Sequence, residues 1–171
     1  MLIRVEIPVD AAGIAKLLRQ AFPTKAESDL VHHLREDGLI TLGVVATDDD
    51  GGVVGYAAFS PVMVNGEDRQ WVGLAPLAVA EAYRGKELGK ALIYEGLDSL
   101  NEFSYAAVTV LGDANYYSAL GFKPASDFNL HSENKGLDAN ATLLIYPLIE
   151  ETLNDVSGLV AYSAPFEQCA K

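Results

Sequence analysis

The chain has 171 residues, of which 50% are hydrophobic and 21% charged, a balance that indicates a globular protein and excludes a disordered one. The formal net charge of −12 argues against nucleic acid as a partner, because neutralising phosphates requires a basic face. The single cysteine, Cys169, excludes a disulfide within the chain, and the lack of any apolar run of ~18 residues predicts a cytoplasmic protein without a membrane partner.

Two helices are predicted in the first 40 residues, after a strand from Leu2 to Ile7. Asp10 is expected to cap the first helix, which ends at Pro23. The second helix is predicted to begin with a capping box formed by Thr24 and Glu27 and to end at Gly38. Apolar residues recur at helical spacing in both helices, namely Ile14, Leu17, Leu18 and Phe22 in the first and Leu30, Val31 and Leu34 in the second.

Three strands joined by tight turns are predicted next, over residues 40–47, 53–64 and 69–79. The first two flank Asp48-Asp49-Asp50-Gly51-Gly52, which is a hairpin signal, and Asn65-Gly66 marks the second hairpin. The run of aspartates lacks the glycine and glutamate spacing of a calcium loop, so it favours a solvated turn over a calcium site.

The most informative stretch runs from Leu77 to Ile93. It combines the end of an apolar strand, a turn with Arg84, Gly85 and Lys86, and the start of an amphipathic helix. The first N–H groups of a helix have no partner within it, so such a junction is suited to bind phosphate. A glycine turn also occurs wherever a helix packs closely on a sheet, and this alternative stays open. The dinucleotide and P-loop motifs are both absent, which argues against nicotinamide chemistry and nucleotide hydrolysis.

A second strand and helix follow about 30 residues downstream. The strand covers Tyr105 to Leu111, and the short helix after it has Asp113 as its N-cap and Gly121 as its C-cap. The helix carries Tyr116 and Tyr117. Packing against the sheet is an ordinary role for such a pair.

These two segments resemble motifs A and B of the GNAT N-acetyltransferase superfamily. Arg84 and Gly89 fill the first and last places of the Gln/Arg-x-x-Gly-x-Gly/Ala loop of motif A, while Glu87 stands where the family usually has glycine. Residues 117–122 match the Tyr-x-x-x-Gly-Phe ending of motif B. The spelling Leu-Gly-Asp-x-x-Tyr-Tyr before it is similar to the predicted N-acetyltransferases of the YhbS type.

The resemblance implies an α/β fold in which a mixed, mostly antiparallel sheet of six to seven strands carries helices on both faces. It covers residues 1–150 as a single GNAT acetyltransferase domain. Residues 151–171 are then a C-terminal extension, in which Gly158 to Tyr162 is predicted to form an added strand.

The resemblance also implies acetyl-CoA as the co-substrate and assigns roles to individual residues. Tyr117 is expected to protonate the leaving thiolate, and the backbone of Leu77 and Val79 is expected to bind pantetheine and the oxyanion. Glu87 is expected to weaken CoA binding, because its charge lies near the diphosphate and a non-glycine residue at positive φ is strained. The residues expected to bind CoA are Leu77, Ala78, Val79, Arg84, Gly85, Lys86, Glu87, Leu88, Gly89, Lys90 and Ala91.

The acceptor is expected to lie beside the two N-terminal helices and the turn at 61–69, with Phe22, His32 and Tyr56 as candidate lining residues. Each is equally compatible with a structural position. The general base stays open, because residues 71–79 contain none of the carboxylates that several family members place on this strand. The candidates are Glu67, Asp68, Glu81, His32, His33, His131 and a chain of waters.

We therefore expect an N-acetyltransferase that moves the acetyl group of acetyl-CoA directly to a primary amine of a small molecule or peptide, without a metal. A non-catalytic acyl-CoA-binding domain with a regulatory or interaction role stays open as the alternative. A homodimer is also compatible with the sequence.

Overall fold

The computed structural model describes residues 1–132 and 141–169, with side chains described as far as Phe166. The inference about the thiol of Cys169 therefore lies outside the described side chains. The helices are α1 (Ala11–Ala21), α2 (Ala26–Glu36), α3 (Leu88–Glu102), α4 (Ala114–Ala119) and α5 (Ala164–Cys169), with short 3-10 helices η1 (Pro8–Asp10), η2 (Glu81–Tyr83), η3 (Ala125–Phe128) and η4 (Glu150–Leu153). The strands are β1 (Leu2–Val5), β2 (Leu42–Thr47), β3 (Val53–Val64), β4 (Glu67–Val79), β5 (Ala107–Gly112), β6 (Lys123–Pro124), β7 (Leu130–His131), β8 (Thr142–Pro147) and β9 (Gly158–Tyr162).

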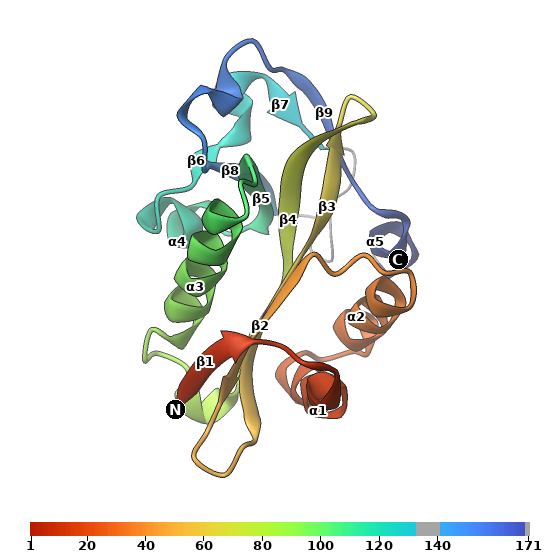
Figure 1. Ribbon diagram of the computed structural model, residues 1–171, viewed down its shortest axis with the longest axis vertical. Helices are drawn as coiled ribbons and strands as arrows, with labels where there is room; N and C mark the ends of the chain where they lie inside the picture. Colours follow the sequence, from red (N-terminus) through yellow and green to blue (C-terminus); the bar gives the residue numbers. More distant parts are fainter. Residues whose placement is uncertain (133–140, 170–171) are drawn as a thin grey trace.

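The sheet is mixed and mostly antiparallel, as predicted. Its main path runs β1-β2-β3-β4-β5-β8-β6, and β4 and β5 are a parallel pair within it. Helices α1, α2 and α5 lie on one side of the sheet and α3 and α4 on the other (Figure 1). The described residues form nine strands, more than the six to seven predicted, because β9 pairs with the end of β3 and the two-residue β7 pairs with β9. The predicted C-terminal strand is thus present.

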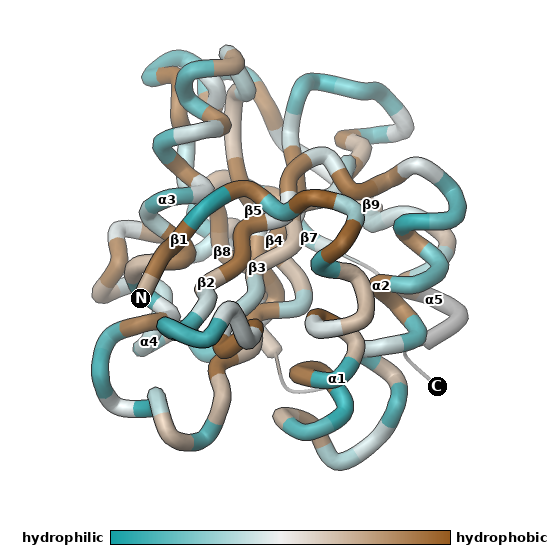
Figure 2. Tube along the Cα trace, turned by 60° about the horizontal axis from the view of Figure 1, so that its bottom comes forward, coloured by the Kyte–Doolittle hydropathy of each residue, from teal (hydrophilic) through white to brown (hydrophobic). Residues whose placement is uncertain are grey.

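The hydrophobic core lies on both faces of the sheet, because the central strands are buried on both sides. β2 is buried along its whole length, and the strands form the brown centre of the molecule in Figure 2. One cluster joins α3 to β2, β3, β4 and β5, and two further clusters lie under α1, α2 and α5. Gly96 lets α3 approach the sheet, since a Cβ there would overlap the ring of Phe59.

The starts of the first two helices differ from the predictions. The Asp10 side chain does not cap α1. Its Oδ2 instead accepts from the backbone N–H of Ile7, which precedes η1, and from Nη1 of Arg4, each at 2.8 Å. The capping box of Thr24 and Glu27 is wrong. The Thr24 hydroxyl accepts from the N–H of Ala26 (3.2 Å), but α2 begins at Ala26 and Glu27 does not reach back to complete the box.

The predicted turns are confirmed by their backbone. The Asp48 carboxylate accepts from the N–H groups of Asp50 (3.0 Å) and Gly52 (2.8 Å), which holds the first hairpin. Asn65 and Gly66 both have positive φ, 53° and 79°, as a tight hairpin turn requires. These two turns set the register of β2, β3 and β4, and β4 carries the candidate site.

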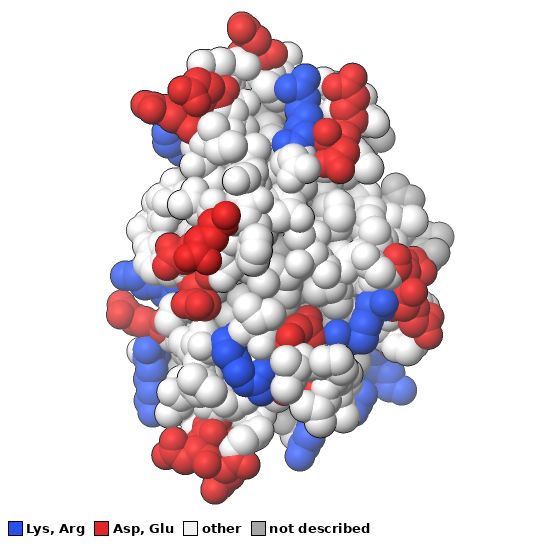
Figure 3. All heavy atoms as spheres, in the orientation of Figure 1, with Lys and Arg blue, Asp and Glu red and all other residues white. Residues whose placement is uncertain are grey.

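On the face shown in Figure 3, acidic and basic side chains are interspersed, and a largely uncharged area lies over β3 and β4. None of the helices in the described part is both long and apolar enough to cross a lipid bilayer.

Candidate active site

The site begins where the parallel strands β4 and β5 part. They pair from Trp71 with Ala107 as far as Leu74 with Val110, and beyond Leu74 the pairing of β4 described in the structure is with β3 alone. Ala75 and Pro76 fall in a register shift of the β3 and β4 ladder. Proline has no N–H to donate to a ladder, so it suits a place where pairing is interrupted. The edge of β4 that faces β5 therefore opens over residues 75–79.

A groove of about 500 Å³ lies between the end of β4, the loop before α3 and helix α4. Gly85 and Glu87 in this loop both have positive φ, 77° and 61°. Glu87 is the N-cap of α3, so the unpaired N–H groups of the first helical turn follow directly after it. The groove is lined by Leu77, Val79, Tyr83, Arg84, Gly85, Glu87, Leu88, Gly89, Lys90, Tyr116, Ala119 and Leu120.

Basic side chains of this loop are held against neighbouring groups. Lys86 Nζ lies 5.9 Å from the centre of the Tyr83 ring, and Lys90 Nζ lies 5.8 Å from that of Tyr94. Arg84 donates from Nε to the carbonyl of Val79 (3.1 Å) and from Nη2 to the carbonyl of Ala21 in α1 (3.3 Å). Arg84 therefore ties the loop to the end of β4 and to α1, whereas the two lysines stay closer to the helix start.

Gly89 lines the groove at the start of α3, where the lack of a side chain leaves space. A Cβ at this position would lie 2.8 Å from the hydroxyl of Tyr116, which is closer than carbon and oxygen atoms normally approach. Tyr116 is 41% exposed and lines the groove. Glycine at position 89 leaves the start of α3 accessible to a ligand.

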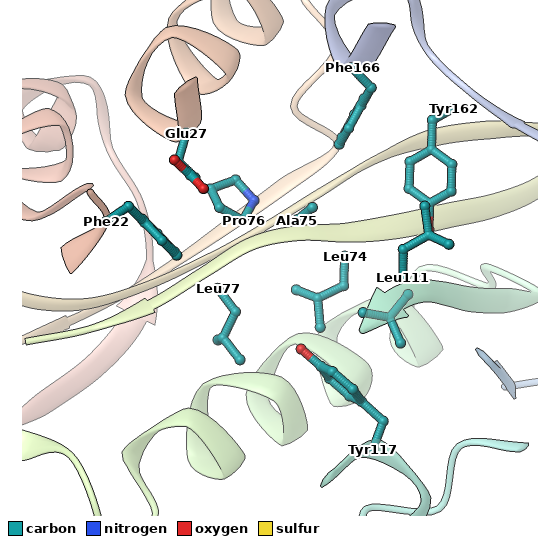
Figure 4. A pocket seen from close by; sticks show the side chains of 11 residues that line it. Phe22, Glu27, Leu74, Ala75, Pro76, Leu77, Leu111, Tyr117, Tyr162 and Phe166 are labelled. Atoms are coloured by element: carbon teal, nitrogen blue, oxygen red, sulfur yellow. The ribbon is translucent and has the colours of Figure 1, made fainter. Parts of the chain in front are cut away.

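A second, smaller pocket of about 270 Å³ adjoins the groove at Leu77, which lines both. Tyr117 enters it from α4 with its hydroxyl directed toward Leu74 and Leu77 (Figure 4). The pocket is lined by Phe22, Glu27, Leu74, Ala75, Pro76, Leu77, Val110, Leu111, Tyr117, Tyr162 and Phe166. These side chains come from both faces of the sheet, so the pocket lies in the opening between β4 and β5.

Tyr117 is held in place by its own helix and by aromatic neighbours. The Asp113 side chain caps α4 by accepting from the N–H of Asn115 (2.9 Å), as predicted. The Tyr117 ring meets Tyr116 and Phe122 edge to face at 5.0 and 5.5 Å. Burial raises the pKa of Tyr117 well above its usual range, so the hydroxyl keeps its proton at neutral pH.

Glu27 faces the same pocket from α2, on the other side of the sheet (Figure 4). Its Oε1 is shielded from solvent and has no hydrogen-bond partner among the described residues. Burial raises the pKa of this carboxyl above its ordinary value. A shielded acceptor without a partner destabilises a fold by about 1–3 kcal/mol, and a donor placed in the pocket would offset this cost.

Two of the three predicted acceptor residues lie away from the pocket. Phe22 lines it, but Tyr56 is fully buried and donates its hydroxyl to Glu6 (2.8 Å), which also accepts from Arg35 (2.9 Å). His32 is 65% exposed on α2, where its Nε2 lies 3.0 Å from the carboxylate of Glu36. Tyr56 therefore belongs to a buried polar cluster, and His32 to the outer surface.

The other candidate bases also stand outside the pocket. The exposed acidic candidates are Glu67, Asp68 and Glu81, and the two remaining histidines are His33, beside His32, and exposed His131. The base candidate that the sequence did not suggest is Glu27. Its position at the start of a helix favoured the capping interpretation instead. Within the described residues, no three side chains of His, Cys, Asp or Glu come together as a metal site would require.

Comparison with known proteins agrees with this geometry. Residues 12–122 match the Acetyltransferase (GNAT) family. The chain is 56% identical over 168 residues to the uncharacterized N-acetyltransferase YhbS of Escherichia coli K12, covering 98% of this chain and 99% of that protein. The 1.55 Å crystal structure of Escherichia coli YhbS in complex with CoA has a TM-score of 0.92 and 55% identity, covering 97% of this chain and 91% of that one.

A Brucella melitensis GNAT acetyltransferase, solved in complex with acetyl-CoA, is also similar, with a TM-score of 0.80 and 32% identity. The match covers 96% of this chain and 97% of that one. The predicted fold and the predicted resemblance are both confirmed by these relatives. The opening between β4 and β5, the loop before α3 and the match across most of the sequence lead to one conclusion: the chain belongs to the acetyltransferase (GNAT) family.

Proposed function

We propose that the protein transfers the acetyl group of acetyl-CoA directly to a primary amine of a small molecule or peptide. The observation that carries this proposal is the meeting of two hollows at Leu77. One is a groove at the N-terminus of a helix, and the other is a pocket into which Tyr117 points. A long co-substrate with a charged end and a reactive end fits this arrangement.

The groove suits CoA because of its backbone. The diphosphate would accept from the N–H groups between Gly85 and Lys90, where the helix macrodipole adds a partial positive charge. Pantetheine would then follow the free edge of β4 at Leu77 and Val79. Similar proteins have been solved with CoA and with acetyl-CoA, which supports this assignment.

We expect Glu87 to weaken the binding of CoA. Its φ of 61° is a conformation that favours glycine, and this negatively charged residue lines the groove. Lys86 and Lys90 offset this charge. We therefore expect CoA to bind, with an affinity that Glu87 limits.

The pocket suits the chemistry of acetyl transfer. A neutral amine attacks the thioester carbonyl, a C–N bond forms, and the C–S bond breaks with release of a thiolate. The Tyr117 hydroxyl would give its proton to this sulfur. A phenol is a weaker acid than a thiol, so Tyr117 acts through its position rather than its acidity. The N–H groups exposed along β4 would stabilise the oxyanion.

In this proposal residues 1–150 are the acetyltransferase domain, and residues from 151 on are an extension that completes the acceptor side. Tyr162 of β9 and Phe166 of α5 line the pocket, and β9 is anchored on β3. The extension is therefore expected to affect the acceptor more than the co-substrate.

A panel of primary amines with acetyl-CoA tests the proposal, with CoA release and acetylated product measured together. We expect product with at least one amine and CoA release that depends on the amine. Tight binding of acetyl-CoA with no product from any amine would favour the alternative, a non-catalytic acyl-CoA-binding domain.

A further inference from the structure

Glu27, a half-buried residue with one enclosed carboxylate oxygen, differs from the two carboxylates that the fold buries more deeply. Glu6 is paired with Arg35 and accepts from Tyr56, and Asp10 is paired with Arg4 at 2.8 Å. Glu27 has no such cation: burial is the main influence on its carboxyl, and no charged neighbour contributes among the described residues. Its enclosed Oε1 is also without a hydrogen-bond partner.

The pocket around Glu27 is apolar and contains no basic group. Among its described lining residues, the titratable side chains are those of Glu27, Tyr117 and Tyr162, and the Tyr162 hydroxyl is already hydrogen-bonded to Thr109 (2.9 Å). Aromatic rings stand on either side of the carboxylate, with Phe22 on one side and Phe166 farther along the pocket (Figure 4). A negative group enclosed by apolar walls attracts a cation with an apolar body.

We propose that Glu27 binds the ammonium group of the acceptor and takes its proton, and that the acceptor is a primary amine carried on an aryl or branched apolar body. This inference rests on the proposed function, because it uses the pocket in which the thioester would lie. It assigns the general base that the sequence left open. It also predicts that acidic acceptors are rejected, since none of the described lining residues offers a cation to them.

The protons balance in this scheme. The acceptor arrives as an ammonium ion, because the pKa of an alkyl amine is about 10.4. One proton passes to a carboxylate oxygen of Glu27, and the freed lone pair attacks the acetyl carbon. A second proton leaves the nitrogen as the tetrahedral intermediate collapses, while the thiolate gains one by way of Tyr117. Glu27 then returns its proton to solvent, so the net products are amide, CoA thiol and one proton.

The burial of Glu27 assists this step. A raised pKa makes the Glu27 carboxylate a stronger base, which reduces the difference between its pKa and that of the ammonium group. The opposed positions of Glu27 and Tyr117, on α2 and α4, place the base and the proton donor on different sides of the same opening. That arrangement lets the nitrogen lose its proton on one side of the opening while the sulfur gains one on the other.

Binding of 2-phenylethylamine to the CoA-saturated protein tests the inference without requiring turnover. The neutral isostere 2-phenylethanol measures the part of the affinity that comes from the apolar lining of the pocket. We expect the amine to bind at least about tenfold more tightly than the alcohol, and Glu27→Gln to abolish that difference while the alcohol binds as before. Asp29→Asn removes the same charge from the exposed side of α2 and should change neither affinity.

Kinetics with the same amine supply the second readout. Glu27→Gln should lower kcat/KM by about 10²–10⁴-fold and remove the acidic limb of the pH profile, whereas Glu27→Asp should restore part of both. Normal kinetics and an unchanged pH profile in Glu27→Gln would overturn the inference, as would equal binding of amine and alcohol by the unmodified protein. Binding that depends on Glu27, together with no acetyl transfer to any amine of the panel, would uphold the ammonium site and contradict the proposed function alone.

Discussion

The co-substrate groove and the acceptor pocket meet at Leu77, but they are built in opposite ways. The groove comes from nearly continuous sequence, residues 77–90 with part of α4, and its proposed contacts are largely backbone N–H groups. The pocket takes side chains from α2, β4, β5, α4, β9 and α5, together with Phe22 after α1. A backbone site depends on local conformation, whereas a side-chain site depends on how distant elements pack. The two halves should therefore respond separately to mutation.

Tyr117→Phe should have the largest effect, because it removes the proposed proton donor and keeps the ring that packs on Phe122. We expect kcat to fall by about 10²–10⁴-fold while acetyl-CoA affinity changes by only a few fold. Steady-state kinetics and calorimetry measure the two quantities. A loss of kcat below about threefold would show that water or another group protonates the thiolate.

Gly89→Glu should act on the groove alone. Its Cβ would displace the Tyr116 hydroxyl, and its carboxylate would repel the diphosphate, so CoA affinity should fall by about 100-fold, mainly through charge. Asn101→Glu, which adds the same charge at the exposed far end of α3, is the matched control. Equal CoA affinity in both variants would place the co-substrate elsewhere.

Phe166→Ala should change the pocket and leave the groove as it is. Phe166 is 3% exposed and packs edge to face on Tyr162 at 5.0 Å. Removing its ring therefore enlarges the pocket and takes away part of its apolar lining. We expect KM for an aryl amine to rise by about tenfold and CoA affinity to stay unchanged. Thermal unfolding must accompany the kinetics, because removing a buried ring also destabilises a fold by about 3–5 kcal/mol. A loss of CoA affinity in a folded variant would contradict the separation of the two halves.

Glu87→Gly should have the smallest effect and the opposite sign. It relieves a residue at positive φ and removes a negative charge from the groove, so CoA should bind about 3–10-fold more tightly. The gain should shrink with added salt, because screening weakens exposed charges. Glu95→Gln on the exposed side of α3 is the control for net charge. Weaker binding by Glu87→Gly would mean that Glu87 contacts the co-substrate or orders Lys86.

The contrast between a groove built from local sequence and a pocket built from distant elements also explains which features could be predicted from the sequence. The turn at Gly85, the start of α3 and the capping of α4 by Asp113 follow from local signals, so their places were predictable. The family resemblance rests on those same segments. The resulting fold prediction is confirmed by the relatives and by the strand order.

The residues of the acceptor pocket were harder to predict from the sequence, because the pattern within a single segment fits more than one role. Glu27 three residues after Thr24 spells a capping box, and only the structure, in which α2 begins at Ala26, shows that Glu27 lines the pocket instead. Tyr56 on a strand gave no sign that Glu6 and Arg35 would enclose it. Such pairings join residues dozens of positions apart, and periodicity does not encode them.

A crystal structure of the CoA complex tests the central claim most directly, because the claim concerns where the reacting sulfur lies. The account predicts the diphosphate on the N–H groups at the start of α3 and the sulfur within about 3.5 Å of the Tyr117 hydroxyl, on the side of the pocket that opens toward Glu27. CoA bound outside the groove, or a sulfur that does not reach the pocket lined by Tyr117 and Glu27, would contradict it.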